Sequence, residues 1–281
     1  MRVAVLGASG FIGKHLSTAL RARGDDVVEI SLRNPHTAAH ASAGCEVVVN
    51  LAGEPLAQRW NADVKRRVME SRSAQPAKFF DALAEADSKP NAYVSASAIG
   101  YYGSSETATF TEASPPGNDF LADVCVAWER TALRAQDFGM RVAIVRAGLV
   151  LGTDGGALAK LLPLFKAGTG GRAGSGAQWY SWIHIDDVVG IYLLAIDRAQ
   201  GPLNGTAPNP VHNKEFTEVL AHVLHRPAAL PAPAFMVKVA LGEGAKLVLE
   251  GQRVLPERTI SEGYTFKYPT LEHALSNLLS R

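Results

Sequence analysis

The chain has 281 residues, of which 47% are hydrophobic and 20% are charged, and its formal net charge is +1. This composition excludes a disordered chain, and the near-zero charge argues against nucleic acid or an anionic membrane surface as a partner. The only two cysteines, Cys45 and Cys125, have no CxxC partner, so they predict neither a disulfide framework nor a zinc site. The opening residues break into glycines without a cleavage pattern, which favours a cytoplasmic protein.

Strand-like and helical segments alternate along the first two thirds of the chain. We predict strands at residues 2–8, 26–32, 46–53, 92–98 and 141–152, and helices at residues 11–24, 64–86, 119–131 and 157–168. This alternation predicts an α/β fold with a Rossmann-type doubly wound parallel sheet. The short connection between the second and third of these strands leaves no room for an additional strand.

The remainder of the chain is less regular. A Gly-rich loop (168–178), an aromatic segment (179–187) and a Pro-rich passage (226–235) predict a lid beside the sheet. The apolar stretch at 235–251 contains Lys238 and Lys246, so it is too interrupted to span a membrane. We expect it to form a core helix.

A glycine-rich turn, GASGFIG, joins the first predicted strand to the first predicted helix. In such a turn one glycine allows the tight bend, one lets the backbone approach a pyrophosphate, and one permits close packing of the helix. The helix then offers free amide groups to the anion. The turn therefore predicts a dinucleotide site, with a purely structural turn as the alternative, and its residues are Gly7, Ser9, Gly10, Phe11, Ile12 and Gly13.

The end of the second predicted strand indicates which dinucleotide is bound. An NAD site places an acidic residue there for the ribose hydroxyls, whereas Glu29 comes too early in this strand. Ser31 and Arg33 follow instead, and an arginine matches a phosphate in a bidentate manner. We therefore predict NADP (NADPH) as the cofactor; the alternative is that Arg33 is a solvated loop residue.

Several further motifs identify a family resemblance. With GASGFIG, NLAG, SASAIGYYG and WIHIDDV in this order, the chain resembles the extended short-chain dehydrogenase/reductases. NLAGEPLAQRW, FLADVCVAWE, GSGAQWYSWIHIDD and GQRVLP are more narrowly similar to an atypical branch called "epimerase family protein". The resemblance implies an NADP-binding domain at residues 1–204 and a small C-terminal domain at 205–281 that covers a substrate cleft. It also implies further cofactor contacts from Leu51, Ala52, Gly53, Arg72, Ser95, Arg146 and Val150; for Arg72 the alternative is a surface salt bridge.

The usual catalytic pair of the superfamily is missing. Ordinary members carry a Tyr and, four residues later, a Lys that lowers the Tyr pKa so that the phenol can exchange a proton. Alignment on Glu129 places Leu121 at the Tyr position and Cys125 at the Lys position. Leucine cannot exchange a proton, and an unperturbed thiol with a pKa of about 8.5 is largely uncharged at neutral pH.

Replacement catalysts are available in SASAIGYYG. Ser97 matches the serine that binds the substrate carbonyl, and Tyr101 or Tyr102 follows it at the carboxyl edge of the sheet. We rank Ser97 first as a catalytic residue, then the tyrosines, and Cys125 last. The alternatives are that the tyrosines pack as wall residues and that Cys125 is a small buried hydrophobe.

The segment WYSWIHIDD contains the remaining candidates. His184 and Asp186 do not complete a metal site, so we predict none and interpret the segment as a structural junction, with Asp187 capping the next helix. Trp179, Tyr180 and Trp182 either line the substrate cleft or pack in the core.

Two functions are compatible with this pattern. The first is an NADP(H)-dependent oxidoreductase or epimerase-like enzyme acting on a small carbonyl or sugar-like molecule. The second is a non-catalytic NADP-binding redox sensor or regulatory protein, for example in cell division. The sequence does not determine whether the chain forms a homo-oligomer.

Overall fold

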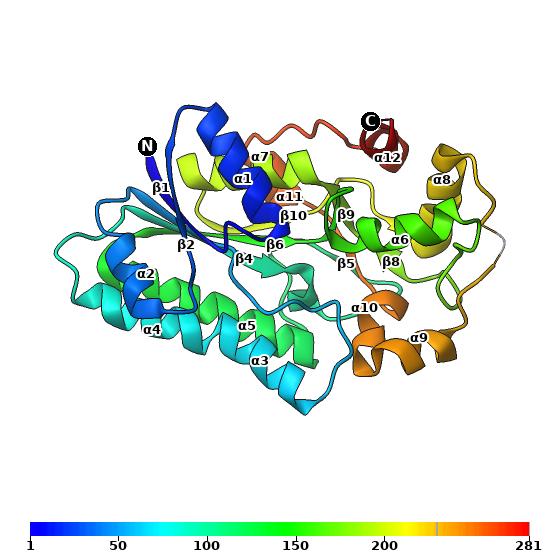
Figure 1. Ribbon diagram of the computed structural model, residues 1–281, viewed down its shortest axis with the longest axis horizontal. Coiled ribbons are helices and arrows are strands. Elements are labelled where there is room, and N and C mark those ends of the chain that lie inside the picture. Colours follow the sequence, from blue (N-terminus) through cyan, green and yellow to red (C-terminus); the bar gives the residue numbers. More distant parts are fainter. Residues whose placement is uncertain (229, 281) are drawn as a thin grey trace.

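The computed structural model describes residues 1–228 and 230–280. Its centre is a six-stranded sheet with the order β10-β6-β4-β3-β1-β2, in which every neighbouring pair is parallel (Figure 1). The expected Rossmann-type fold class is therefore confirmed. The strands are β1 (Arg2–Leu6), β2 (Asp26–Ile30), β3 (Val47–Asn50), β4 (Ala92–Ala98), β6 (Arg141–Ala147) and β10 (Gly201–Gly205).

Helices cover both faces of this sheet (Figure 1). Alternate residues of β1 point to opposite faces, so that Val3 and Val5 pack in one buried cluster and Ala4 and Leu6 in another. The first cluster lies under α1 (Phe11–Ala22) and α7 (Ile185–Asp197). The second lies under α2 (Pro35–Ala41), α4 (Ala74–Ala84) and α5 (Phe120–Leu133), with α3 (Ala62–Arg72) alongside (Figure 1).

The direction of winding changes at β1. From β1 the chain passes to β2 on one side, and α2 then carries it back to β3 on the other side. In sheets of this kind ligands bind at such a switch point, outside the carboxyl ends of the strands. No strand lies between β2 and β3 in the chain, so β2 is the edge strand and the expected absence of a further strand is confirmed.

Two predicted elements are divided in the structure. The helix expected at 64–86 breaks at Ser73 between α3 and α4, where φ −114° and ψ −64° depart from the values of a regular helix. The strand expected at 141–152 breaks at Gly148, where an added Cβ would lie 2.2 Å from the Ser181 oxygen. Beyond Gly148 the chain leaves the main sheet and pairs as β7 with β9.

The C-terminal part is built around a third buried cluster that contains Trp182. Three helices surround this cluster: α6 (Gly156–Lys166), α8 (Asn213–Leu224) and α12 (Leu271–Leu279). Short paired strands join this region to the main domain: β5 (Thr109–Phe110), β7 (Leu149–Leu151), β8 (Trp179–Tyr180), β9 (Trp182–His184), β11 (Val211–His212) and β12 (Arg253–Val254). The remaining short elements are η1 (Ile99–Tyr102), η2 (Arg134–Phe138), α9 (Ala234–Leu241), η3 (Glu243–Ala245), α10 (Lys246–Leu249) and α11 (Glu257–Ser261).

The expectation of a core helix at 235–251 is wrong. Gly242, with φ 58°, ends α9 and divides the segment. None of the α9 residues is buried, and Phe235 and Val239 are 67% and 69% exposed. An apolar sequence does not by itself provide a packing partner, and this helix lies at the margin of the molecule (Figure 1).

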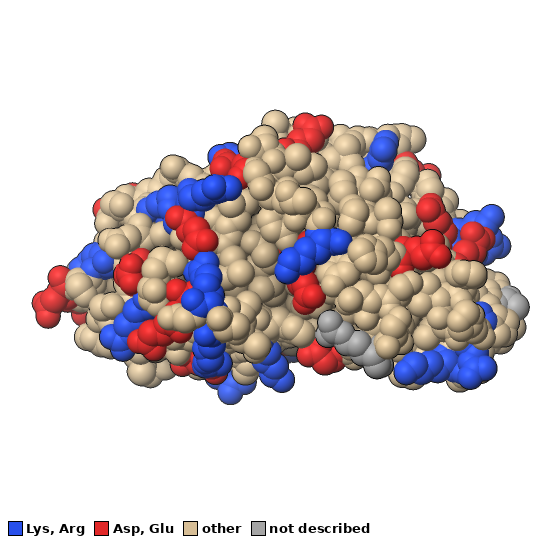
Figure 2. Space-filling view, turned by 90° about the horizontal axis from the view of Figure 1, so that it is seen from above, with Lys and Arg blue, Asp and Glu red and all other residues tan. Residues whose placement is uncertain are grey.

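The surface carries both signs of charge. Figure 2 shows basic and acidic side chains interspersed on one face, with no large area of a single sign. Among the helices of residues 1–228 and 230–280, none is both long and apolar enough to cross a bilayer.

Candidate cofactor and active site

Two glycines bring the turn after β1 close to its neighbours. Gly7 has φ +84°, and a Cβ at this position would lie 2.9 Å from the Ala52 nitrogen in the loop after β3. A Cβ on Gly13 would lie 2.3 Å from the Gly7 oxygen. No larger residue fits either position without a backbone shift, so the glycines allow the β1 turn, the β3 loop and α1 to meet at the switch point.

The first turn of α1 faces this point with unoccupied amide groups. Gly10 is the N-cap and provides no side-chain hydrogen bond, and the first turn contains no acidic residue. Ser9 and Gly10 are exposed, so the amides of Phe11, Ile12 and Gly13 are available together with the positive end of the helix dipole. This arrangement binds a phosphate group.

A cleft of about 830 Å³ begins at this turn and runs over the ends of β1, β2 and β3. The cleft brings together predicted cofactor residues from three separate segments: Gly7, Ser9, Gly10, Ser31, Arg33, Leu51, Ala52 and Gly53. Sequence reasoning missed the contributions of Glu54, Ser71 and Gln75. Ser71 adjoins the predicted Arg72, but only the break between α3 and α4 brings Gln75 to the same wall.

The end of β2 presents a cation to the cleft. Arg33 and Ser31 are exposed, and the Arg33 amide donates to the Ser31 hydroxyl at 3.3 Å. Within residues 1–228 and 230–280 the Arg33 guanidinium forms no ion pair or hydrogen bond. Glu29 also lines the cleft, but its carboxylate is paired with Arg21 at 2.6 Å. Arg33 is therefore the charged side chain at the end of β2 that is available to bind a ligand.

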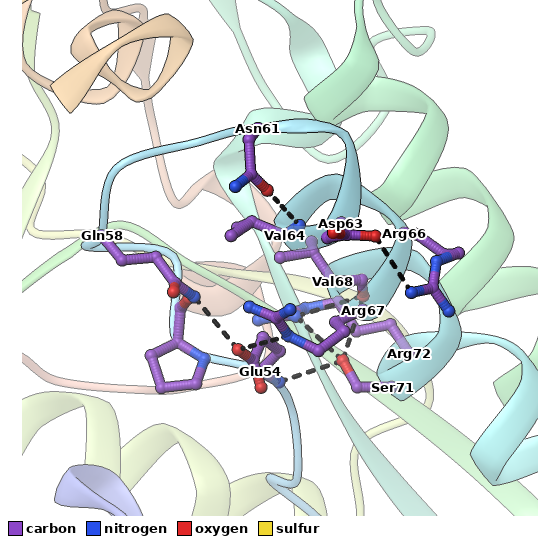
Figure 3. A network of polar contacts seen from close by, with 11 residues as sticks. Glu54, Gln58, Asn61, Asp63, Val64, Arg66, Arg67, Val68, Ser71 and Arg72 are labelled. Atoms are coloured by element: carbon purple, nitrogen blue, oxygen red, sulfur yellow. Dashed lines mark hydrogen bonds and ion pairs between the residues drawn. The ribbon is translucent and has the colours of Figure 1, made fainter.

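Hydrogen bonds hold the loop after β3 in place. The buried Asn50 accepts from the Ala52 amide at 3.1 Å and donates to the Tyr93 hydroxyl at 2.9 Å. The Glu54 amide donates to the Ser71 hydroxyl of α3 at 3.0 Å (Figure 3). These contacts fix the loop against both the sheet and α3.

The Glu54 side chain closes the same network. Gln58 donates to it at 3.1 Å and Arg67 at 3.3 Å (Figure 3). The hydrogen bond from Gln58, with that from Arg67, holds the pKa of Glu54 below its usual value. The Glu54 carboxylate therefore stays ionised and is engaged by Gln58 and Arg67 in the wall of the cleft.

Arg72 is buried behind the loop. It is 8% exposed, and its guanidinium lies against Gly53, where an added Cβ would be 3.0 Å from Cζ. Nη1 makes long contacts to the Val68 oxygen at 3.4 Å and the Ser71 hydroxyl at 3.3 Å, and Cζ lies 4.9 Å from the Trp128 ring centroid. Burial lowers the pKa of Arg72. The alternative of a surface salt bridge does not apply to this buried side chain.

Three predicted cofactor residues direct their side chains elsewhere. The Phe11 ring packs into the loop 152–156, where an added Cβ on Gly155 would lie 2.5 Å from Cδ2. The Ser95 hydroxyl donates to the Ala96 oxygen at 2.9 Å, and Val150 packs against the cluster under α1 and α7. Contacts of Phe11 with a cofactor would therefore come from its backbone amide.

Ser97 belongs to a buried ionic network. Its hydroxyl donates to Glu129 at 2.7 Å, and Arg146 donates to both oxygens of the same carboxylate at 2.8 Å. Although burial acts to lower the pKa of Arg146, the Glu129 carboxylate raises it above the ordinary range. The predicted cofactor contact Arg146 is therefore engaged with its own neighbours.

The two tyrosines occupy different environments. The buried Tyr102 hydroxyl accepts from Arg146 at 3.0 Å and donates to Asn204 at 2.7 Å, and burial raises its pKa to about 12. Tyr101 is half-buried, and the Arg146 guanidinium lies 3.5 Å from its ring centroid. Within the described residues the Tyr101 hydroxyl makes no hydrogen bond. Of the pair, only Tyr101 has an uncommitted hydroxyl.

Cys125 and Leu121 pack beneath the start of η1. A Cβ added to Gly100 would lie 3.3 Å from Leu121 Cβ and 3.8 Å from Cys125 Sγ. The Cys125 thiol donates to the Ala98 oxygen at 3.6 Å, and burial raises its pKa to about 12. This environment favours the alternative of a small buried hydrophobe.

The aromatic segment is mainly structural. Trp182 is fully buried in the third cluster, whereas Trp179 and Tyr180 are half-buried. The prediction that Asp187 caps a helix is wrong, because α7 already begins at Ile185. His184 is the N-cap, and its side chain accepts a hydrogen bond from the Asp186 amide. Asp187 instead joins α7 to the C-terminal segment, where its carboxylate accepts hydrogen bonds from Tyr264, Lys267 and Tyr268.

Known proteins share this architecture. Residues 3–207 match the model of the NAD dependent epimerase/dehydratase family, and residues 232–278 match a domain of unknown function, DUF1731. The chloroplastic epimerase family protein SDR39U1 homolog of Arabidopsis thaliana is 43% identical over 303 residues, covering 99% of this chain and 87% of the relative.

Solved structures of other proteins share the fold of this chain. The crystal structure of human epimerase family protein SDR39U1 (isoform 2) with NADPH is 36% identical, covers 100% of both chains and has a TM-score of 0.92. A UDP-glucose 4-epimerase from Thermotoga maritima, with 16% identity, 100% of this chain and 98% of that chain covered and a TM-score of 0.82, shares the fold. The chain therefore belongs to the NAD dependent epimerase/dehydratase family.

Proposed function

We propose that the chain is an NADP(H)-dependent oxidoreductase or epimerase-like enzyme that acts on a small carbonyl or sugar-like molecule. The observation that carries this proposal is the unpaired Arg33 guanidinium at the mouth of a cleft that begins at free helix amides. The α1 amides would hold the pyrophosphate, and Arg33 with Ser31 would hold the 2′-phosphate. The human relative crystallised with NADPH supports the same cofactor.

The residues at the carboxyl end of β4 have distinct chemical roles in this proposal. When bound, the nicotinamide supplies or accepts a hydride. The Ser97 hydroxyl donates its hydrogen bond to Glu129, so toward a substrate it offers only a lone pair and accepts a hydrogen bond from a substrate hydroxyl. We assign the accompanying proton transfer to Tyr101, since the Tyr102 hydroxyl is engaged by Arg146 and Asn204.

Cofactor binding is the first test. Titration of the purified chain with NADPH and NADH should show clear preference for NADPH. Arg33→Ala should weaken NADPH binding about tenfold to a hundredfold, because a charge-assisted phosphate contact contributes about 1.5–3 kcal/mol, and should leave NADH binding unchanged. Equal affinity of the unmodified chain for the two nucleotides would overturn the assignment.

Turnover is the second test. The chain should reduce members of a panel of small carbonyl compounds with NADPH. Ser97→Ala and Tyr101→Phe should each lower kcat, whereas Tyr102→Phe should act through stability. Full activity of both Ser97→Ala and Tyr101→Phe would refute the assigned roles.

One observation favours a second function, that of an NADP-binding sensor without turnover. Leu121 and the protonated Cys125 provide no proton-exchanging pair on α5. A sensor should bind NADPH and recruit a partner only in the nucleotide-bound state. Ser97-dependent turnover of any metabolite would exclude this function.

A further inference from the structure

We propose that Arg72 makes the cleft selective for the redox state of its nucleotide, by placing a positive charge without a carboxylate partner beside the nicotinamide half. This inference rests on the proposed function, because it requires that the cleft binds NADP(H). It concerns a different property, which is the discrimination between the reduced and the oxidised form.

The isolation of Arg72 is unusual for a buried arginine. Arg146, which is equally buried, has the Glu129 carboxylate at 2.8 Å. On the same helix as Arg72, Arg66 pairs with Asp63 on the surface and Arg67 pairs with Glu54 in the wall of the cleft. Among residues 1–228 and 230–280, no carboxylate oxygen lies within 4.0 Å of the Arg72 guanidinium. A buried cation without a carboxylate partner lowers stability, and Arg72 lies directly behind Gly53, which lines the cleft, so its charge acts on a ligand bound there.

The position of Arg72 determines which half of the dinucleotide lies nearest to its guanidinium. Its guanidinium lies between Gly53, after β3, and Trp128 of α5. In the sheet, β3 and β4 lie on the opposite side of β1 from β2, whose end carries Ser31 and Arg33. A dinucleotide whose adenosine phosphate lies at β2 and whose pyrophosphate lies at α1 extends its other half over β3 and β4. Arg72 is therefore on the nicotinamide side.

Neighbouring groups offset this charge only in part: burial lowers the pKa of Arg72, while the Glu54 carboxylate attracts Arg72 from beyond 4.0 Å and acts to raise that pKa. Glu54 is engaged by Gln58 and Arg67 (Figure 3), and Glu129 is engaged by Arg146. Cys125 carries no charge at neutral pH, so the cation on this side comes from α3 and not from α5. The oxidised nicotinamide ring bears a positive charge and the reduced ring is neutral. In a site of reduced dielectric constant the guanidinium therefore disfavours the oxidised nucleotide.

The test compares the dissociation constants of NADPH and NADP⁺ in the full chain by anaerobic calorimetry. Both nucleotides carry the same phosphates, so the ratio of the two constants isolates the contribution of the ring charge. We expect the unmodified chain to bind NADPH at least about tenfold more tightly than NADP⁺, because at an effective dielectric constant of about 20 the repulsion between two unit charges up to about 10 Å apart exceeds the free energy of a tenfold ratio. Arg72→Met should reduce the ratio to near unity, and Arg72→Lys, which retains the charge, should preserve it.

Two further variants control the experiment. Arg66→Met removes an exposed, paired charge from the same helix and should leave the ratio unchanged. Arg72→Gln is a second neutral variant in case Arg72→Met does not fold, and the thermal stability of each cofactor-free variant is measured in parallel. Adding Cys125→Lys to Arg72→Met should restore the preference for NADPH, since it returns a cation to the same side.

The outcomes separate the two proposals. If the unmodified chain binds neither nucleotide, the proposed function fails and this inference fails with it. If it binds NADPH but both neutral variants keep the ratio of the unmodified chain, only the inference is overturned. Equal weakening of NADPH and NADP⁺ also overturns it, because Arg72 would then be a phosphate ligand.

Discussion

Glu129→Gln should strongly destabilise the chain. The carboxylate accepts one hydrogen bond from Ser97 at 2.7 Å and two from Arg146 at 2.8 Å, and both charged side chains are less than one tenth exposed. An amide keeps the shape of the carboxylate but leaves the Arg146 guanidinium as an uncompensated buried charge. Breaking a buried pair in this way costs about 3–5 kcal/mol, which corresponds to a fall in Tm on the order of 10 °C for a chain of this size.

Urea unfolding followed by circular dichroism measures this free energy directly. The matched control is the double variant Glu129→Leu/Arg146→Met, which removes both charges and should be less destabilised than Glu129→Gln alone. The same comparison reports on Ser97, whose hydroxyl loses its charged acceptor in both variants. A free energy of unfolding for Glu129→Gln within about 1 kcal/mol of that of the unmodified chain would refute the assignment of a buried, mutually neutralised pair.

Three further changes test other parts of the structure. Gly13→Ala places a Cβ 2.3 Å from the Gly7 oxygen, so it should cost about 1–3 kcal/mol and abolish NADPH binding in a titration; unchanged affinity would contradict the proposed cradle. The folded chain keeps the Cys125 proton up to a pKa of about 12, so above pH 9 only the unfolded chain releases it and stability falls by up to about 1.4 kcal/mol per pH unit. Cys125→Ala should show a shallower slope of unfolding free energy between pH 9 and 11, and an identical slope would argue against the raised pKa. Asp187→Asn should weaken the contacts to Lys267 and Tyr268 and speed hydrogen exchange of these two amides, while exchange in β1 stays unchanged.

The cofactor cradle could be predicted from sequence because its determinants are local. Gly7, Gly10 and Gly13 lie within one turn, and the strand before them and the helix after them follow from apolar spacing. The break at Ser73 was missed although Pro76 lies three residues beyond it, in the first turn of α4. The helical spacing of apolar residues continues from α3 into α4, so this spacing alone does not reveal the break.

The polar network could not be predicted in the same way. Ser97, Glu129, Arg146 and Asn204 are separated by many residues, and they meet only because β4, β6 and β10 pair side by side and α5 packs on β4 and β6. Nothing in the sequence distinguishes Tyr101 from Tyr102, whereas the Asn204 contact separates them in the structure. The exposed α9 was mistaken for a core helix for the same reason, since an apolar sequence does not define what lies beside it.

The two buried arginines differ in how their charges are compensated, in a site whose helix α5 lacks the Tyr and Lys of ordinary short-chain dehydrogenase/reductases. Glu129 compensates the charge of Arg146 and holds Ser97, and the Arg146 guanidinium packs on the tyrosine rings, so this pair orders the site but adds little net electrostatic field. Arg72 has no such partner and provides the positive field on the side of β3 and β4. A cation beside the ring and a hydroxyl that only accepts hydrogen bonds together favour a reduced nucleotide with a hydroxyl-bearing ligand. Carbonyl reduction pairs NADPH with the carbonyl and NADP⁺ with the alcohol, so NADPH with an alcohol is an unreactive complex. Turnover therefore requires NADPH to meet the carbonyl form and Tyr101 to give a proton to its oxygen as the hydride is transferred, and this proton transfer separates an enzyme from a sensor.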